Sequence, residues 1–555
     1  MKNKAIKDLS FATNDSVKGF KRLLGSTALA TSLVATSFFT GLTPAAHAAD
    51  GQAVGIANST TTVNASTTNI AQSDLTLQTD ENSATTFTLT GGIAIDTLLF
   101  ENSATVASTI TVSSNITVDE AITMGNQGSG ATTYTFNVAE DKVWTLTGNA
   151  TVGTNANLAF NLLKGEMALN GSAAQAIAMT ILSDSGDDGV LTMTGAGKKT
   201  FSKVIGGTEL GSMTNAAATS AEFNAAFDTK VVTNLGTLQF DAATGVNTLT
   251  NSGTVNLNAA TTNVDADDQA ALIMHTTGSI LNLNAGGNVN QNVILTATTD
   301  GFGTINIFDA TQDAAGGITT LVADSLIGTD AKRIGTLNIG KADGTSAGNL
   351  VTVNASAIFA DNINITGGNT ANEDSMLSAL EAVSSTAITL SATGLADATL
   401  KTLTATTAIA GTVDSASGVD GAGFTIINAD IATQFAANVG ATVAIEKMDI
   451  AAIKVDVDGV TNAIEAVNFS ADGTLEFGAA ANQTFTGAIA AATNEHGLIT
   501  NANTAGVLTF AGGLGAENKR IKEVSLLDNT DTTFENAIFA LDLDIDTAAA
   551  DDVTT

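Results

Sequence analysis

A five-residue phrase, in which glycine precedes alternating polar and apolar residues, recurs along the chain. It reads Gly-Thr-Leu-Gln-Phe at 236–240, and close copies follow at 253–257, 303–307, 335–339 and 473–477. Successive side chains of an extended strand point to opposite faces. The apolar residues of each phrase therefore share one face, and we predict a short strand at each copy with one buried side.

The spacing of these phrases predicts a solenoid. With the variant at 278–283 included, consecutive copies between Gly236 and Gly335 begin 17, 25, 25 and 32 residues apart. Imperfect repeats of about this length, separated by Asn, Asp and Gly turns, are typical of stacked β-coils. We predict an all-β fold, a right-handed parallel β-helix or solenoid. Tandem antiparallel β-sandwiches are the alternative, because they also use short alternating strands.

Proline and cysteine usage fits this prediction. Pro44 is the only proline, and the chain has no cysteine. Proline has no backbone N–H and interrupts a ladder of strands, so its exclusion after residue 44 favours continuous pairing. Without cysteine there are no disulfides and no thiolate metal ligands.

The first 48 residues have the pattern of an export signal. Basic residues precede an apolar run over 23–42, and Ala46-His47-Ala48 follows as a small-residue cleavage motif. We predict residues 1–48 as a signal peptide that is cleaved between Ala48 and Ala49. No later apolar run reaches the roughly 20 residues of a membrane span, so we expect no transmembrane helix after the signal peptide.

The remaining chain is predicted as solenoid over 49–371 and 384–555, with a short helical insertion at 372–383. Asn372 is a suitable helix cap, and acidic residues follow it. The segment 218–227 is a second, weaker helix candidate.

The charge balance excludes one class of partner. The leader holds 6 of the 21 Lys and Arg and 2 of the 55 Asp and Glu, so the remainder carries 15 basic against 53 acidic residues, a net charge of −38. Such a surface repels phosphate backbones, and nucleic acid is not expected as a partner. It attracts cations instead.

Three acidic clusters are candidate cation sites, because Ca²⁺ takes six to eight oxygen ligands and Asp-rich turns offer them. None has the spacing of an EF-hand loop. We favour the interpretation that each cluster is a solvated turn. No metal or cofactor is therefore assigned, and Ca²⁺ is the only cation considered. The candidates are Asp184, Asp187, Asp188, Asp265, Asp267, Asp268, Asp456 and Asp458.

No catalytic residue is predicted. His275 and His496 stand outside the motifs of triads and metal sites, and Trp144 and Tyr134 are the only tryptophan and tyrosine, which leaves little for stacking on sugars. We therefore predict that the protein is not an enzyme. The alternative is a secreted polysaccharide-active β-helix enzyme with a pair of carboxylates on one face.

The segments 191–197, 333–340 and 519–526 resemble passenger domains of autotransporters, in particular the large rickettsial surface antigens of the outer membrane protein B kind. The resemblance implies a β-helical passenger on the surface or outer membrane of a Gram-negative bacterium, or a secreted one. It would act as a structural coat or adhesin, with the host-cell surface or neighbouring copies of itself as partners. The translocator barrel that ends such proteins is not evident in the sequence. A self-assembling surface-layer protein is an alternative, because an acidic, cysteine-free composition rich in Thr, Ala and Asn suits that class too.

Overall fold

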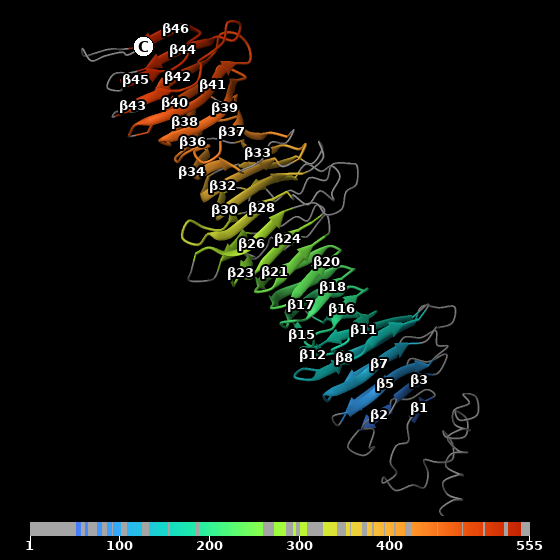
Figure 1. The fold of residues 1–555 in the computed structure, drawn as a ribbon. Helices are drawn as coiled ribbons and strands as arrows, with labels where there is room; N and C mark the ends of the chain where they lie inside the picture. The colour runs from blue at the N-terminus through green and yellow to red at the C-terminus, as the bar shows by residue number, and fades with distance from the viewer. Residues whose placement is uncertain are drawn as a thin grey trace, which may run out of the picture. The chain divides into compact units, whose positions relative to one another are not determined.

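The computed structural model describes residues 52–545 with internal gaps. The gaps lie at 57–60, 65–74, 80–85, 91–92, 102–107, 125–131, 154–155, 185–187, 259–270, 285–291, 296–299, 308–325, 341–350, 356, 369–373, 380–381, 393, 404–406, 417–422, 452, 480, 503–505 and 527–530. The regular structure in the described residues is entirely β-strand (Figure 1). The predicted signal peptide and its cleavage site at Ala48 and Ala49 lie outside the described residues.

The chain divides into two units, residues 1–212 and 213–555, and strand β17 (Ile205–Asn215) crosses the boundary. The first unit contains β1 (Gln52–Ile56), β2 (Thr61–Asn64), β3 (Leu75–Thr79), β4 (Thr86–Thr90), β5 (Ile93–Glu101), β6 (Ser108–Val112), β7 (Ile116–Met124), β8 (Thr132–Val138), β9 (Val143–Leu146), β10 (Asn149–Val152), β11 (Ala156–Leu162), β12 (Glu166–Leu169), β13 (Gln175–Ile177), β14 (Thr180–Ser183), β15 (Asp188–Met193) and β16 (Lys198–Phe201).

The strands of the second unit are β18 (Ser220–Phe223), β19 (Phe227–Asn234), β20 (Thr237–Phe240), β21 (Thr244–Asn251), β22 (Thr254–Leu257), β23 (Ala271–Met274), β24 (Ile280–Leu283), β25 (Asn292–Leu295), β26 (Phe302–Ile307), β27 (Leu326–Ile327), β28 (Ile334–Ile339), β29 (Val351–Ala355), β30 (Ala357–Gly367), β31 (Ser375–Ala379), β32 (Val383–Ala392), β33 (Ala398–Thr402), β34 (Thr407–Ser415), β35 (Thr425–Ala429), β36 (Thr433–Phe435), β37 (Ile445–Ile450), β38 (Val455–Val457), β39 (Thr461–Phe469), β40 (Thr474–Phe477), β41 (Gln483–Ala491), β42 (His496–Asn501), β43 (Val507–Phe510), β44 (Ile521–Leu526), β45 (Asp531–Phe534) and β46 (Ala540–Ile545).

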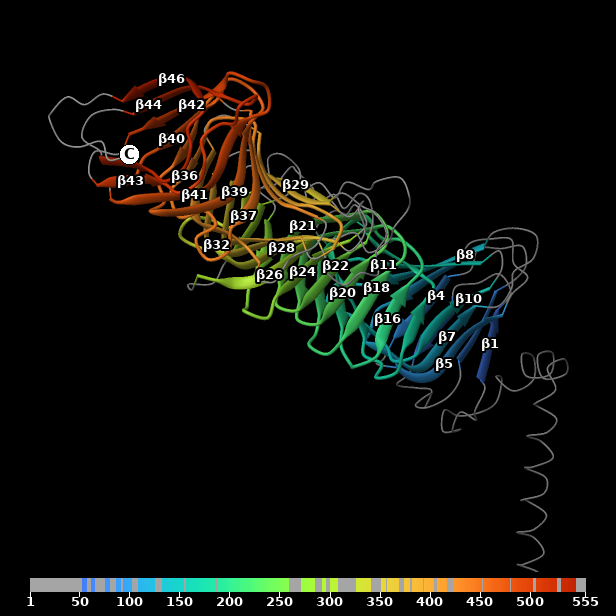
Figure 2. The same cartoon turned by 45° about the horizontal axis from the view of Figure 1, so that its top comes forward.

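Both units are parallel β-solenoids. In the first unit β4 pairs with β6 and β5 with β7, and in the second β20 pairs with β22 and β22 with β24, all in parallel. The odd-numbered strands from β29 to β45 form a nine-stranded sheet of the second unit (Figure 2). Each strand therefore pairs with its equivalent one turn away. The solenoid prediction is confirmed, and the alternative of antiparallel sandwiches is wrong.

The recurring phrases stack directly on one another. Strands β20, β22, β24, β26 and β28 pair without stagger, which places one apolar residue of each phrase on the next. These inward residues are Leu238, Val255, Leu281, Ile305 and Leu337, and all are buried. The period of two thus lines the solenoid interior with aliphatic side chains.

The glycine of the phrase is required by the closeness of the turns. A Cβ added to Gly253 would lie 2.0 Å from the carbonyl oxygen of Gly236, one turn away, and one added to Gly236 would lie 2.1 Å from that of Thr219. Real contacts of this kind do not fall below about 3 Å, so the backbone must shift to admit any side chain. In the next turn Ser279 takes this place, and its Oγ donates a 2.7 Å hydrogen bond to the carbonyl of Asn251.

The only tryptophan belongs to the core of the first unit. Trp144 is fully buried, and its ring lies edge-on to Phe136 and Phe160 with centroids 4.9 and 5.3 Å away. Phe136 and Phe160 stack face to face at 4.4 Å. These rings fill the interior, as expected for core packing.

The helix predicted over 372–383 is wrong in the described part of that segment. Ser375–Ala379 is strand β31, which pairs with β29 and β33, and its Leu377 is buried opposite Leu400 of β33. The weaker candidate over 218–227 is wrong as well, because Ser220–Phe223 is β18. Pairing with neighbouring turns outweighs the small helix propensity of these short segments.

We expect proline to break the ladder where it removes a paired N–H. The N–H of Thr254 donates a 2.8 Å hydrogen bond to the carbonyl of Gly236. Thr254→Pro removes this hydrogen bond from the ladder, leaves the carbonyl only its 3.2 Å bond from Asn234 Nδ2, and should destabilise the solenoid by about 3 kcal/mol or more. Thr254→Ala, which keeps the N–H, should cost less than about 1 kcal/mol. Thermal unfolding followed by circular dichroism measures both, and equal effects would contradict the role of the ladder.

Candidate functional site

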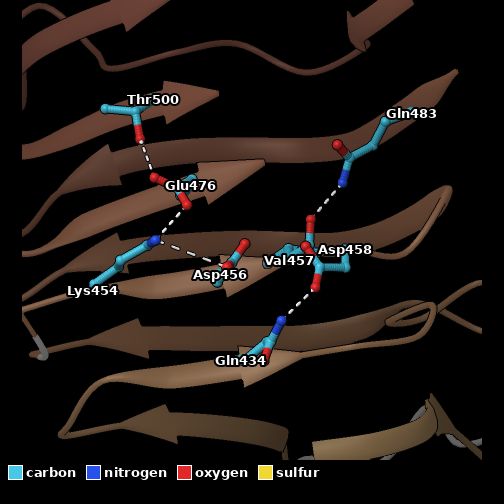
Figure 3. A network of polar contacts seen from close by, with 8 residues as sticks. All are labelled: Gln434, Lys454, Asp456, Val457, Asp458, Glu476, Gln483 and Thr500. Carbon is cyan, nitrogen blue, oxygen red and sulfur yellow. Dashed lines mark hydrogen bonds and ion pairs between the residues drawn. The ribbon is translucent and has the colours of Figure 1, made fainter. Parts of the chain in front are cut away.

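One acidic cluster from the sequence becomes part of a polar network on an outward face of the second unit (Figure 3). Strand β38 lies between β36 and β40, and its register places Asp456 beside Gln434 on one side and Glu476 on the other. Thr500 of β42 follows Glu476 in the same stack. Four turns therefore contribute side chains to this network.

Most carboxylates of this network have a partner. Lys454 binds Glu476, and its Nζ lies 3.8 Å from Oδ2 of Asp456. Gln434 Nε2 donates a 2.7 Å hydrogen bond to Oδ2 of Asp458, and Thr500 Oγ1 donates one of 3.5 Å to Glu476 Oε2. The Lys454 ammonium therefore supplies the positive charge beside these carboxylates.

Asp456 is the electrostatically unusual member. Its Oδ1 is buried and accepts no hydrogen bond. Burial, and next the charge of Asp458, raise the pKa of Asp456 to about 6, although the Lys454 ammonium opposes this. The hydrogen bond with Glu476 in turn raises the pKa of Lys454. The arrangement can take up a proton close to neutral pH.

Of the other cation candidates, the two that the structure describes do not join this network. Asp184 is exposed just after β14, and Asp188 begins β15. The remaining four candidates, Asp187, Asp265, Asp267 and Asp268, lie outside the described residues. Within the described ranges, no group of three or more His, Cys, Asp or Glu side chains is placed to hold a metal ion. The interpretation of these clusters as solvated turns, with Ca²⁺ as the only cation considered, stays a prediction.

A second polar feature is a row of asparagines along the outward face of β22–β30. After the first, each donates from Nδ2 to the Oδ1 of the asparagine one turn earlier, at 2.7–2.8 Å. The row consists of Asn256, Asn282, Asn306, Asn338 and Asn364. We call it the outer amide row. Sequence reasoning missed it, although the signal is present as the third residue after glycine in three of the phrases and as the fourth in the variant at 278–283.

A shorter row lies inside the turns. Buried Asn215 donates to Asn234 at 2.8 Å, and Asn234 donates to Asn251 at 2.9 Å. The Oδ1 atoms of Asn234 and Asn251 also accept the N–H of Gly236 and Gly253. We call these three residues the inner amide row. It satisfies backbone groups at a corner where the three amide side chains themselves are fully buried.

Buried long side chains have the same function at other corners. Gln175 Nε2 donates to the carbonyls of Leu146 and Gly148 at 3.3 and 2.6 Å, and Gln483 Nε2 to those of Val457 and Gly459 at 2.6 and 2.9 Å. Lys199 pairs with Gln175 in register, and its Nζ donates to the carbonyls of Gly171 and Gly197 at 2.6 and 2.9 Å. Burial lowers the pKa of Lys199. These contacts identify the buried lysine as a backbone cap.

No protein-family model matches the sequence, and searches of curated proteins and of solved structures find no match either. The described residues contain no helix that is long and apolar enough to cross a membrane.

Asp456 should make stability depend on pH. Its folded-state pKa is raised above the ordinary value of 3.8 to about 6, so the folded state binds more protons than the unfolded state between pH 4 and 6. Stability therefore falls as the pH rises through that window. Asp456→Asn should stabilise the protein by about 1–3 kcal/mol at pH 7.5 and by little at pH 4. Melting temperatures measured across this range test it.

The matched control for this prediction is Asp184→Asn, which removes an exposed carboxylate. It should leave the pH dependence of the melting temperature unchanged. An Asp456→Asn variant whose pH profile equals that of the unmodified protein would contradict the assignment.

The two amide rows should differ in energetic weight. Asn234→Ala removes the acceptor of the Gly236 N–H, the shortest acceptor of Asn215 Nδ2 and the donor to Asn251, which should cost about 3 kcal/mol or more. Asn306→Ala removes a half-buried side chain whose partners can bind water, so it should cost about 1 kcal/mol or less. Denaturant unfolding compares the variants, and an equal loss would contradict this distinction.

Proposed function

We propose that the protein is an exported, non-enzymatic surface protein whose passenger-like β-solenoid acts as a structural coat or adhesin. The single observation that carries this proposal is the outer amide row. Its polar groups repeat at every turn and bind one another, so the face presents a regular surface with no isolated reactive group. A repeating surface of this kind suits extended contact with a cell surface or with further copies.

The carboxylate network supports the non-enzymatic part of the proposal. Two carboxylates with free access to a sugar are what a glycosidase requires. Here Glu476 and Asp456 share the ammonium of Lys454, and Asp458 is bound by Gln434. These contacts favour a structural function for the most closely grouped acids.

Export is supported by the sequence of residues 1–48, with its basic start, apolar run and Ala-His-Ala motif. A solenoid without cysteine does not depend on an oxidising compartment for its stability. We place the protein on the surface or outer membrane of a Gram-negative cell, or free in the medium. A self-assembling surface layer is the second candidate, and the neutrality of the outer amide row favours it.

The test is the location of the protein in cells that express the full gene. Added protease should digest it on intact cells, or it should be recovered from the medium, while a cytoplasmic marker stays intact. Recovery only from the cytoplasmic fraction would overturn the proposal. For the enzymatic alternative, purified protein is incubated with neutral and acidic glycans, and turnover that Glu476→Gln abolishes would overturn the non-enzymatic assignment.

A further inference from the structure

The outward face that runs from β22 through β24, β26 and β28 to Asn362 and Asn364 of β30 carries no charge in a strongly acidic chain, and Asp361 of β30 stands at its edge. Its outward positions are filled by Thr and Asn residues and one Ile, namely Thr254, Asn256, Ile280, Asn282, Thr304, Asn306, Thr336, Asn338, Asn362 and Asn364. The chain as a whole has a net charge of −34. We call these ten positions the neutral face.

Carboxylates appear where this face ends. On the N-terminal side, Gln239 of β20 binds Asp241 at 2.9 Å and approaches Glu222 at 3.5 Å. On the C-terminal side, the stack continues from Asn364 to Thr389 and then to Asp414. The uncharged stretch thus continues to Gln239 and Thr389, and the carboxylates around it are Glu222, Asp241, Asp361 and Asp414.

We propose that the neutral face is a contact surface for a second copy of this chain. Two acidic molecules repel each other wherever their carboxylates meet, and like charges directly opposite are destabilising. Contact between identical faces is favoured where a face carries no charge. The ten positions of the neutral face meet this condition over five strands, and carboxylates such as Asp361 and Asp414 stand only at their border.

The spacing of the face also favours a copy of itself as partner. Strands recur about every 4.8 Å, and alternate residues along a strand lie about 6.6 Å apart. A second copy has the same two spacings, so Thr and Asn rows of the two faces can interdigitate along their whole length, as in stacked sheets. The outer amide row uses one N–H and one Oδ1 lone pair per residue, and each amide retains a second donor and acceptor.

The area predicts a weak contact. Five strands about 4.8 Å apart, each about five residues of 3.3 Å long, cover roughly 400 Å² per copy. This lies at the low end for specific interfaces, where transient complexes are found. Such a contact gains strength when many copies are held on one surface. The strengthening by many copies on one cell surface rests on the proposed function. The contact between two copies in solution does not.

The experiment measures association of the purified full-length protein by sedimentation at increasing concentration. We expect a dissociation constant in the micromolar range or weaker. Thr304→Glu with Thr336→Glu places two carboxylates on adjacent strands of the neutral face, and should weaken association at least tenfold. The matched control is Thr233→Glu with Thr250→Glu, which adds the same charge on outward positions of adjacent strands β19 and β21.

Cross-linking identifies the face directly, because the chain has no cysteine. Thr304 lies on β26, the central strand of the neutral face, so a two-fold contact brings it close to its equivalent in the other copy. Thr304→Cys should form an oxidised dimer faster than Thr250→Cys. A protein that stays monomeric, equal weakening by both double variants, or equal cross-linking at both positions would overturn the inference.

These outcomes are independent of the test of surface location. A monomeric protein that protease digests on intact cells overturns the contact surface and leaves the proposed function standing. A protein that associates through this face but stays in the cytoplasm overturns the proposed function and leaves the contact surface standing.

Discussion

Parallel pairing of each strand with its equivalent one turn away is the constraint on which the rest of this structure depends. The pairing has no stagger over the recurring phrases, so every side chain lies beside the residue at the same place in the next turn. Aliphatic residues stack into the core, and amides stack into rows. The same closeness excludes proline from the ladder and a Cβ from the corner at Gly253.

This constraint determines how an acidic chain can remain folded. Identical placement of carboxylates on successive turns would set like charges side by side. Several described contacts offset this by placing a cation or an amide beside the carboxylates, although Glu523 and Asp542 do lie opposite each other on β44 and β46. Lys454 lies between Glu476 and Asp456, and Asp241 accepts hydrogen bonds from Gln239 and Asn258. Where no charge is present at all, the outer amide row extends through five strands.

The recurring phrase was sufficient to predict the solenoid, because its period of two and its spacing both follow from stacking. The same reasoning failed over 372–383, where capping residues indicated a helix and pairing with β29 and β33 formed a strand instead. The sequence also grouped Asp456 with Asp458 correctly. It did not show Glu476, Lys454 and Gln434 around them, because the contacts between these residues come from separate turns.

By itself, the sequence determined the fold class, the buried face of each phrase and the exclusion of proline, because these depend on local alternation and on repetition. Only the tertiary structure decided which polar residues meet. The distance along the chain between neighbouring rungs varies with the length of the intervening turns, from 17 residues between Asn234 and Asn251 to 32 between Asn306 and Asn338. Such variable spacing carries no fixed signal, so the amide rows and the paired carboxylates become visible only when the turns are stacked.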